Sequence, residues 1–165
     1  TYMVSAFADG TFAIPDGSNM MEQAAYFTEE KERALEEAHQ NVERAIAFAL
    51  PLIQAGAEVI FMCADYCFND GPFLSPRMFR QFVTPFLKRQ VEAFRAAGAF
   101  SVKHTDGNIM PILDQLLEAG PDALHSLDPM AGVDIGTVRD MVGDAVCLIG
   151  NVNCAYLQQG PRRRS

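Results

Sequence analysis

The chain has 165 residues and a mass of 18.1 kDa, which is too short for a closed (β/α)₈ barrel of about 250 residues. Its composition, 49% hydrophobic and 21% charged with a mean hydropathy of +0.02, excludes a disordered or collagen-like chain. The sequence shows no membrane-spanning run and no signal segment, so we expect a cytoplasmic protein. The net charge of −8 argues against a nucleic-acid partner, which needs a basic face.

The first predicted elements are a strand and a long helix. The segment Tyr2–Phe12 is typical of a strand with a glycine turn. The helix that follows is predicted to start at Asn19 or at Thr28, and Pro51 is expected to kink it. Its inward face is predicted from apolar residues spaced three or four positions apart: Leu35, Ala38, Val42, Ile46, Ala49 and Ile53.

Three further helices carry start signals. Ser75-Pro76 is typical of an N-cap serine followed by proline at the first helical position, and Pro85 is expected to kink this helix. Asn108 is expected to cap a helix over Ile109–Ala119, and Asp134 is expected to cap a shorter one.

The most regular feature of the sequence is a glycine followed by a short apolar run and then by an acid or amide. The glycines are Gly56, Gly98, Gly120 and Gly143, and the polar residues are Asp65, Asp106, Asp128 and Asn151. A helix that ends on glycine, then a buried strand, then a polar residue is one unit of a β/α ladder. We therefore predict an α/β fold of about five parallel strands with intervening helices, either doubly wound or part of a (β/α)₈ barrel.

Polar residues cluster where the predicted strands end, which is where α/β folds place their active sites. The segments are Asp65-Tyr66, His104–Asp106, His125–Asp128 and Asn151–Cys154. For any one aspartate, capping of the next helix is an equally good explanation. Their occurrence at four successive strand ends favours a functional rim.

Within this rim, His104 and Asp106 lie two residues apart, so an extended strand directs both side chains to one face. Such a pair can bind a metal or act as an acid and base, and the alternative is a hydrogen-bonded pair without metal. His125 is expected to be structural. Lys103 is expected to point to the opposite face and to be a snorkelling interface residue.

Several segments in order carry a family resemblance: Ala55–Ile60 leading to Asp65, Gly71–Pro76, Lys103–Asn108, Ser126–Pro129 and Leu148–Val152. The sequence resembles the uroporphyrinogen decarboxylase (URO-D) superfamily, which includes the decarboxylases of haem biosynthesis and corrinoid-linked methyltransferases. The resemblance implies a partial (β/α)₈ barrel over residues 1–157, holding the middle and later strands. Residues 158–165 form a basic tail that departs from the family pattern.

The resemblance also implies site residues. In the methyltransferases a His-x-Cys pair and a later cysteine bind zinc. The matching pair here is His104 and Asp106, so a carboxylate replaces one ligand, and the later cysteine would lie beyond residue 165. The expected catalytic residues are Asp65, His104, Asp106 and Asp128. The expected substrate-binding residues are Tyr66, Asn108, Asn151 and Asn153.

The charge of the predicted rim helps to distinguish decarboxylation from methyl transfer, the two reactions of the superfamily. Uroporphyrinogen is a polyanion, whereas the predicted rim is acidic: Asp65, Asp70, Asp106 and Asp128. We therefore expect the parent enzyme to be a metal-assisted methyltransferase with zinc, a corrinoid-bound methyl donor and a small-molecule or tetrapyrrole substrate. One alternative is a cofactor-free decarboxylase. The other is a truncated, non-catalytic fragment that forms homo-oligomers through open sheet edges.

Overall fold

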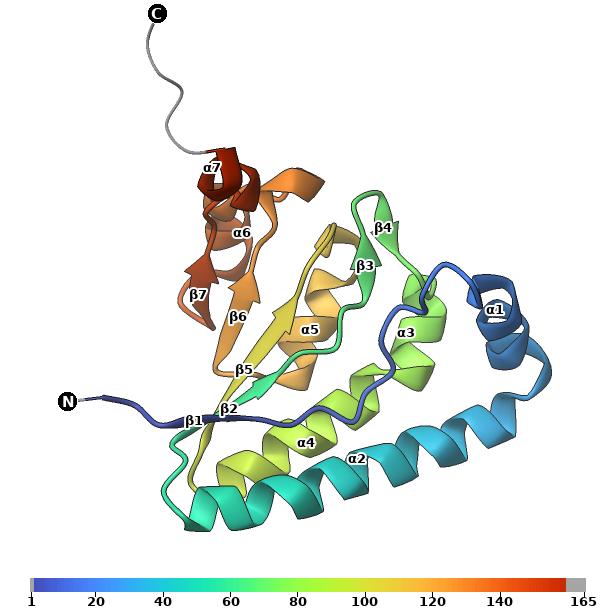
Figure 1. Cartoon of the computed structure of the whole chain (residues 1–165), viewed down its shortest axis with the longest axis horizontal. Coiled ribbons are helices and arrows are strands. Elements are labelled where there is room, and N and C mark those ends of the chain that lie inside the picture. Colours follow the sequence, from blue (N-terminus) through green and yellow to red (C-terminus); the bar gives the residue numbers. More distant parts are fainter. Residues whose placement is uncertain (1, 160–165) are drawn as a thin grey trace, which may run out of the picture.

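A five-stranded parallel sheet forms one layer of the computed structural model, which describes residues 2–159 (Figure 1). The strands follow one another in space as they do in the sequence: Ser5–Phe7 (β1), Val59–Met62 (β2), Phe100–Thr105 (β5), Ala123–Ser126 (β6) and Cys147–Gly150 (β7). Every neighbouring pair is parallel, so the carboxyl ends of the strands meet at one edge of the sheet. The prediction of about five parallel strands with intervening helices is confirmed.

Helices cover one face of the sheet, and the main core lies between the two layers (Figure 1). The helices are Met20–Glu29 (α1), Lys31–Gln54 (α2), Pro76–Phe82 (α3), Thr84–Ala96 (α4), Leu113–Ala119 (α5), Ile135–Val142 (α6) and Cys154–Gln159 (α7). The remaining elements are the 3₁₀ helices Met110–Ile112 (η1) and Pro129–Ala131 (η2) and the hairpin Cys67–Phe68 (β3) with Gly71–Pro72 (β4).

Local signals place most of the helix starts where the sequence predicts them. The Ser75 hydroxyl accepts the Met78 N–H at 3.3 Å, which caps α3, and Asp134 Oδ1 accepts the Thr137 N–H at 2.7 Å, which caps α6. Asn108 Oδ1 accepts the Met110 N–H at 3.1 Å, but the first turn there is the 3₁₀ helix η1, and α5 follows it.

Several boundaries differ from the prediction. The helix that follows Ser75 is divided at Val83, just before Pro85, into α3 and α4. The first strand is only β1, much shorter than Tyr2–Phe12. The long helix is divided at Glu30 into α1 and α2; Asn19 precedes α1 as predicted, but Thr28 lies inside it. The Thr28 hydroxyl donates to the Ala25 carbonyl at 2.9 Å, so it bonds backward within α1 instead of capping a new helix.

The other face of the sheet, which we call the inner face, carries a separate apolar cluster. Its members are Val59, Val102 and Ala123, with Phe61 and Ile149 packed against them. They line a hollow of about 640 Å³ that Phe100, 57% exposed, also borders. In a closed barrel, side chains of this face fill the interior.

Gly10 brings the loop after β1 into direct contact with α2. A Cβ atom on Gly10 would lie 2.4 Å from the Asn41 carbonyl oxygen and 2.7 Å from the Val42 Cα. Gly10→Ala should therefore push the loop away from α2 and lower the free energy of unfolding by about 2 kcal/mol. Urea denaturation measures this, with Gly17→Ala as the control because nothing lies within 4 Å of its Cβ position. Equal stability of the two variants would contradict the expected contact.

Candidate functional site

Three polar side chains converge at the carboxyl ends of β2 and β5. His104 Nε2 lies 3.6 Å from Asp65 Oδ1 and 3.9 Å from Asp106 Oδ2. One ligand atom from each of the three residues lies within 4.8 Å of the others. All three side chains are reachable from solvent, the His104 side chain least at 22% exposed. The structure thus joins Asp65 to the pair that the sequence singles out, and we call these three residues the Asp–His–Asp cluster.

Each member of the cluster is held by a further hydrogen bond. The Asp106 N–H donates to Asp65 Oδ1 at 2.8 Å, and the Ser126 hydroxyl donates to Asp106 Oδ1. His104 Nδ1 lies 2.7 Å from His125 Nδ1. These hydrogen bonds fix how the three side chains are oriented toward one another.

His125, expected to be structural, contacts the cluster directly through His104. It stands opposite His104 in the register of β5 and β6, and the Phe61 ring packs edge-on against it with a centroid distance of 6.0 Å. Burial lowers the pKa of His125, as does the neighbouring His104, while Asp106 opposes the shift. The sequence places both histidines near the ends of neighbouring predicted strands, two and three residues before a repeat acid, but only the register of β5 and β6 aligns them.

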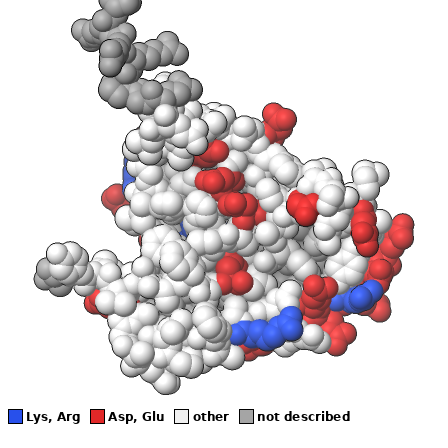
Figure 2. All heavy atoms as spheres, in the orientation of Figure 1, with Lys and Arg blue, Asp and Glu red and all other residues white. Residues whose placement is uncertain are grey.

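The cluster lies in acidic surroundings. Figure 2 shows acidic side chains gathered across the middle of the face seen there and around α1 and α2, with basic side chains beside α2. The Asp–His–Asp cluster itself brings two carboxylates to one point. Such a site attracts cations and disfavours a polyanion.

Beneath the cluster lies a buried ion pair. Lys103 is fully buried, and its Nζ lies 2.7 Å from Asp9 Oδ2 and donates to the Ala64 carbonyl at 2.9 Å. The Ala64 N–H donates to the same Asp9 oxygen at 2.9 Å. The pair therefore holds Ala64 from both sides, immediately before Asp65.

Lys103 points away from His104 as predicted, but the expectation of a snorkelling side chain is wrong. Its ammonium group is enclosed between the sheet and the helices, where Asp9 compensates its charge, and it lies 4.1 Å from the centre of the Tyr66 ring. Burial lowers the pKa of Lys103, against the attraction of Asp9. Burial would raise the pKa of Asp9, but Lys103 and the hydrogen bonds from Thr11 together lower it.

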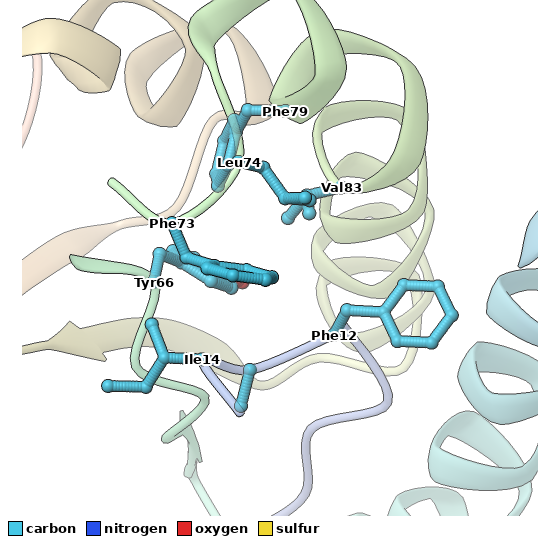
Figure 3. Close-up of a pocket in the computed structure, with 8 residues that line it drawn as sticks. Phe12, Ile14, Tyr66, Phe73, Leu74, Phe79 and Val83 are labelled. Atoms are coloured by element: carbon cyan, nitrogen blue, oxygen red, sulfur yellow. The ribbon is translucent and has the colours of Figure 1, made fainter. Parts of the chain in front are cut away.

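Tyr66, expected to bind substrate, faces the helix layer instead. Figure 3 shows its side chain in a small apolar pocket that Phe73 and Phe79 also line, and its ring packs edge-on against Phe79 with a centroid distance of 4.9 Å. Its hydroxyl lies 2.6 Å from the Thr11 hydroxyl, and the side chain is buried. Burial raises the pKa of Tyr66 well above its ordinary value. Tyr66 therefore does not reach the Asp–His–Asp cluster: its side chain points toward Thr11 and the helix layer, whereas Asp65 Oδ1 faces His104. Substrate binding by Tyr66 stays a prediction.

Asp128, expected to be catalytic, holds the local backbone in place. Its Oδ1 accepts the Met130 N–H at 2.8 Å, which caps η2, and its Oδ2 faces the Gly107 N–H at 3.4 Å. Gly107 has a φ of +82°, and a Cβ there would lie 2.4 Å from the Cys67 carbonyl oxygen. Asp128 thus connects the loops after β5 and β6, and its catalytic role stays a prediction.

The three asparagines expected to bind substrate also make local hydrogen bonds. Asn108 Oδ1 bonds the η1 backbone as described above, and Asn153 Oδ1 accepts the Ala155 N–H at 2.9 Å. Asn151 Nδ2 donates to the Leu127 carbonyl at 3.0 Å. Helix capping and loop closure account for these bonds. Contact of these residues with a substrate stays a prediction.

Comparison with known proteins places the chain in a family. It matches the family Uroporphyrinogen decarboxylase (URO-D) over residues 13–164. The chain belongs to the URO-D family. Sequential parallel strands in a member of this family show part of a (β/α)₈ barrel, as predicted. The Asp–His–Asp cluster then lies at the carboxyl face, where barrel enzymes carry their active sites.

Relatives of this URO-D chain have two kinds of name. It is 31% identical over 123 residues to methylcobamide:CoM methyltransferase MtaA of Methanosarcina barkeri, covering 73% of the chain and 34% of the relative. It is 30% identical over 126 residues to a uroporphyrinogen decarboxylase of Coxiella burnetii, covering 70% and 31%. It is 28% identical over 118 residues to that of Chlorobium luteolum, covering 67% and 30%. The chain thus spans about a third of these relatives.

Two expectations about the chain as a whole remain. Within residues 2–159, none of the helices is both long and apolar enough to cross a membrane. The division expected after Leu157 stays a prediction, since α7 runs to Gln159 and the rest of the basic tail, residues 160–165, lies outside the described part of the chain.

Proposed function

We propose that this chain belongs to a metal-assisted methyltransferase of the URO-D family, in which the Asp–His–Asp cluster holds a divalent cation. The observation that carries the proposal is the convergence of one histidine nitrogen and two carboxylates within 4.8 Å. Imidazole and carboxylate are zinc ligands, and tetrahedral zinc separates its ligand atoms by about 3.4 Å. The distances from His104 Nε2, 3.6 and 3.9 Å, are close to that separation.

The charge of the cluster supports the same proposal. Asp65 and Asp106 together offset the charge of a divalent cation, and His104 adds a neutral ligand. A bound zinc ion supplies one kind of chemistry here, which is to lower the pKa of a thiol that coordinates it. The Methanosarcina relative is named for a methylcobamide and CoM. We therefore propose a corrinoid-bound methyl donor and a thiol acceptor as the substrate class.

Decarboxylation is the second candidate, because the Coxiella and Chlorobium relatives are named uroporphyrinogen decarboxylases. An aspartate such as Asp65 or Asp106 would then accept hydrogen bonds from pyrrole N–H groups and stabilise positive charge that develops on the macrocycle, without a cofactor. The acidic rim counts against this candidate, since a substrate with many carboxylates would be repelled unless other parts of the protein supply basic groups.

Self-association is a third proposal, and it does not require catalysis. β1 and β7 lie at the two edges of the sheet, and Phe7 on β1 is 66% exposed. Edge strands and an apolar inner face favour pairing with a further chain. Size-exclusion chromatography tests this proposal: a monomer at micromolar concentration would contradict it.

The full-length protein distinguishes the two reactions. We expect it to methylate a thiol when supplied with methylcobamide, to lose this activity after treatment with a metal chelator, and to recover it when zinc is restored. Release of CO₂ from uroporphyrinogen at a rate that the chelator does not change would instead support the decarboxylase. The two substrates should be assayed on the same preparation, so that a misfolded sample cannot imitate either result.

A further inference from the structure

The contact between His104 and His125 constrains which ring nitrogen of each histidine carries a hydrogen. The two Nδ1 atoms are 2.7 Å apart, and the ring centroids are 4.9 Å apart. One Nδ1 must carry a hydrogen and the other must offer a lone pair, because two N–H groups or two lone pairs at this distance repel each other. The contact therefore selects a tautomer for each ring.

The opposite nitrogen of His104 decides which ring is the donor. His104 Nε2 faces Asp65 and Asp106 and is the only ring nitrogen of His104 left to bind a cation. A histidine that binds a cation through Nε2 needs its lone pair there, so the hydrogen of the neutral ring lies on Nδ1. His125 Nδ1 is then the acceptor.

The end of β6 is shaped so that two consecutive residues serve the cluster. On a regular strand His125 and Ser126 would point to opposite faces. Ser126 has a φ of +89°, which breaks the alternation and lets its hydroxyl donate to Asp106 while His125 contacts His104. A φ of this kind is uncommon for a residue other than glycine.

We propose that His125 is a positioning residue of the cation site: it accepts the His104 Nδ1–H and so directs the His104 Nε2 lone pair toward Asp65 and Asp106. His125 itself is not a ligand, since its Nδ1 faces His104 and its ring is flanked by Phe61. This inference rests on the proposed cation site.

Two substitutions separate the hydrogen bond from the volume of the side chain. His125→Leu removes the acceptor and keeps an apolar contact with Phe61, whereas His125→Gln retains an oxygen that can accept the His104 Nδ1–H. His39→Leu is the matched control, because His39 is exposed on α2, away from the sheet. Far-UV circular dichroism shows that each variant folds.

The first readout is the tautomer of His104 in the zinc-bound protein, and it does not depend on activity. Nitrogen-15 chemical shifts of the His104 ring should show a hydrogen on Nδ1 and zinc on Nε2 in the wild type and in His125→Gln, and a smaller zinc-bound fraction in His125→Leu at the same zinc concentration. A zinc-bound wild-type His104 without hydrogen on Nδ1 would overturn the proposal.

The second readout is zinc affinity, measured by competition with a chromophoric chelator. His125→Leu should bind zinc about 10–100-fold more weakly than the wild type, the effect typical of residues that orient a metal ligand, and His125→Gln should recover most of the loss. Equal affinity of His125→Leu and the wild type would overturn the proposal. A wild type that binds no zinc would contradict the proposed cation function, and the positioning role that rests on it would fall with it.

Discussion

Replacing Lys103 with methionine should lower the free energy of unfolding by about 3–5 kcal/mol, because the substitution leaves a buried carboxylate without its counter-ion. The Lys103 side chain is fully buried, and that of Asp9 is only 9% exposed. Methionine matches the length of the lysine stem, so little packing is lost with the charge. Urea denaturation at neutral pH measures the effect.

Two matched variants make this result specific. Lys88→Met removes an exposed lysine of α4 and should change stability by less than about 0.5 kcal/mol. The double variant Asp9→Asn with Lys103→Met removes both charges and should recover part of the loss, since no unpaired buried charge remains. A Lys103→Met protein as stable as Lys88→Met would show that the pair does not form.

The pair also predicts how stability depends on pH. The Asp9 pKa is lowered in the folded protein from its ordinary value of 3.8, so the unfolded chain binds the proton more tightly. The contribution of Asp9 to stability should therefore be present at neutral pH and be lost as the pH falls below that ordinary value. Denaturation of the Asp9→Asn variant should lack this part of the acid dependence.

Substitution of His104 should have the largest effect on metal binding. His104→Ala removes the ligand nitrogen and should weaken zinc binding by about 100-fold or more, because loss of a direct ligand exceeds the 10–100-fold effect of residues that only orient one. Asp65→Asn and Asp106→Asn keep an oxygen but lose a negative charge, so each should have a smaller effect. Isothermal titration with zinc measures all three.

Controls from the same region distinguish a cluster from general acidity. Asp70→Asn removes an exposed carboxylate in the turn of the β3–β4 hairpin, outside the Asp–His–Asp cluster. It should leave zinc affinity within about twofold of the wild type, because exposed charges outside the binding site are screened by salt. If Asp70→Asn and Asp106→Asn weaken binding equally, zinc is held by diffuse negative charge and the cluster is not its site.

The fold could be predicted because its signals are local. The glycines that end the helices adopt positive φ, as Gly98 at +92° and Gly120 at +74° illustrate. An acid or amide follows within about three residues of the ends of β2, β5, β6 and β7. Parallel pairing then brings these residues to one edge without further information. Convergence of Asp65 with Asp106 follows from this register alone.

The rest depends on contacts between distant segments. Asp9 and Lys103 are 94 residues apart in the sequence, so no local pattern connects them. The side chains of Lys103 and His104 point to opposite faces of β5, as expected. The loop after β1, which carries Asp9, decides whether the Lys103 side chain reaches solvent or a buried partner. The direction of Tyr66 depends in the same way on Thr11.

Tertiary packing also sets the break between α1 and α2. Phe27 near the end of α1 is buried, with ring centroids of Phe12 and Phe82 at 5.0 and 5.1 Å. The sequence predicts one long helix that starts at Asn19 or at Thr28, and the apolar spacing, which begins at Leu35, does not decide between these starts. Packing of Phe27 against two other segments requires the chain to change direction at Glu30.

The most direct test of the cation site is anomalous X-ray scattering at the zinc edge from crystals of the protein soaked in zinc. The account predicts one anomalous peak bounded by His104 Nε2 and the carboxylates of Asp65 and Asp106, and its disappearance in His104→Ala. Absence of a peak there in the wild type, with zinc bound elsewhere or not at all, would contradict the account.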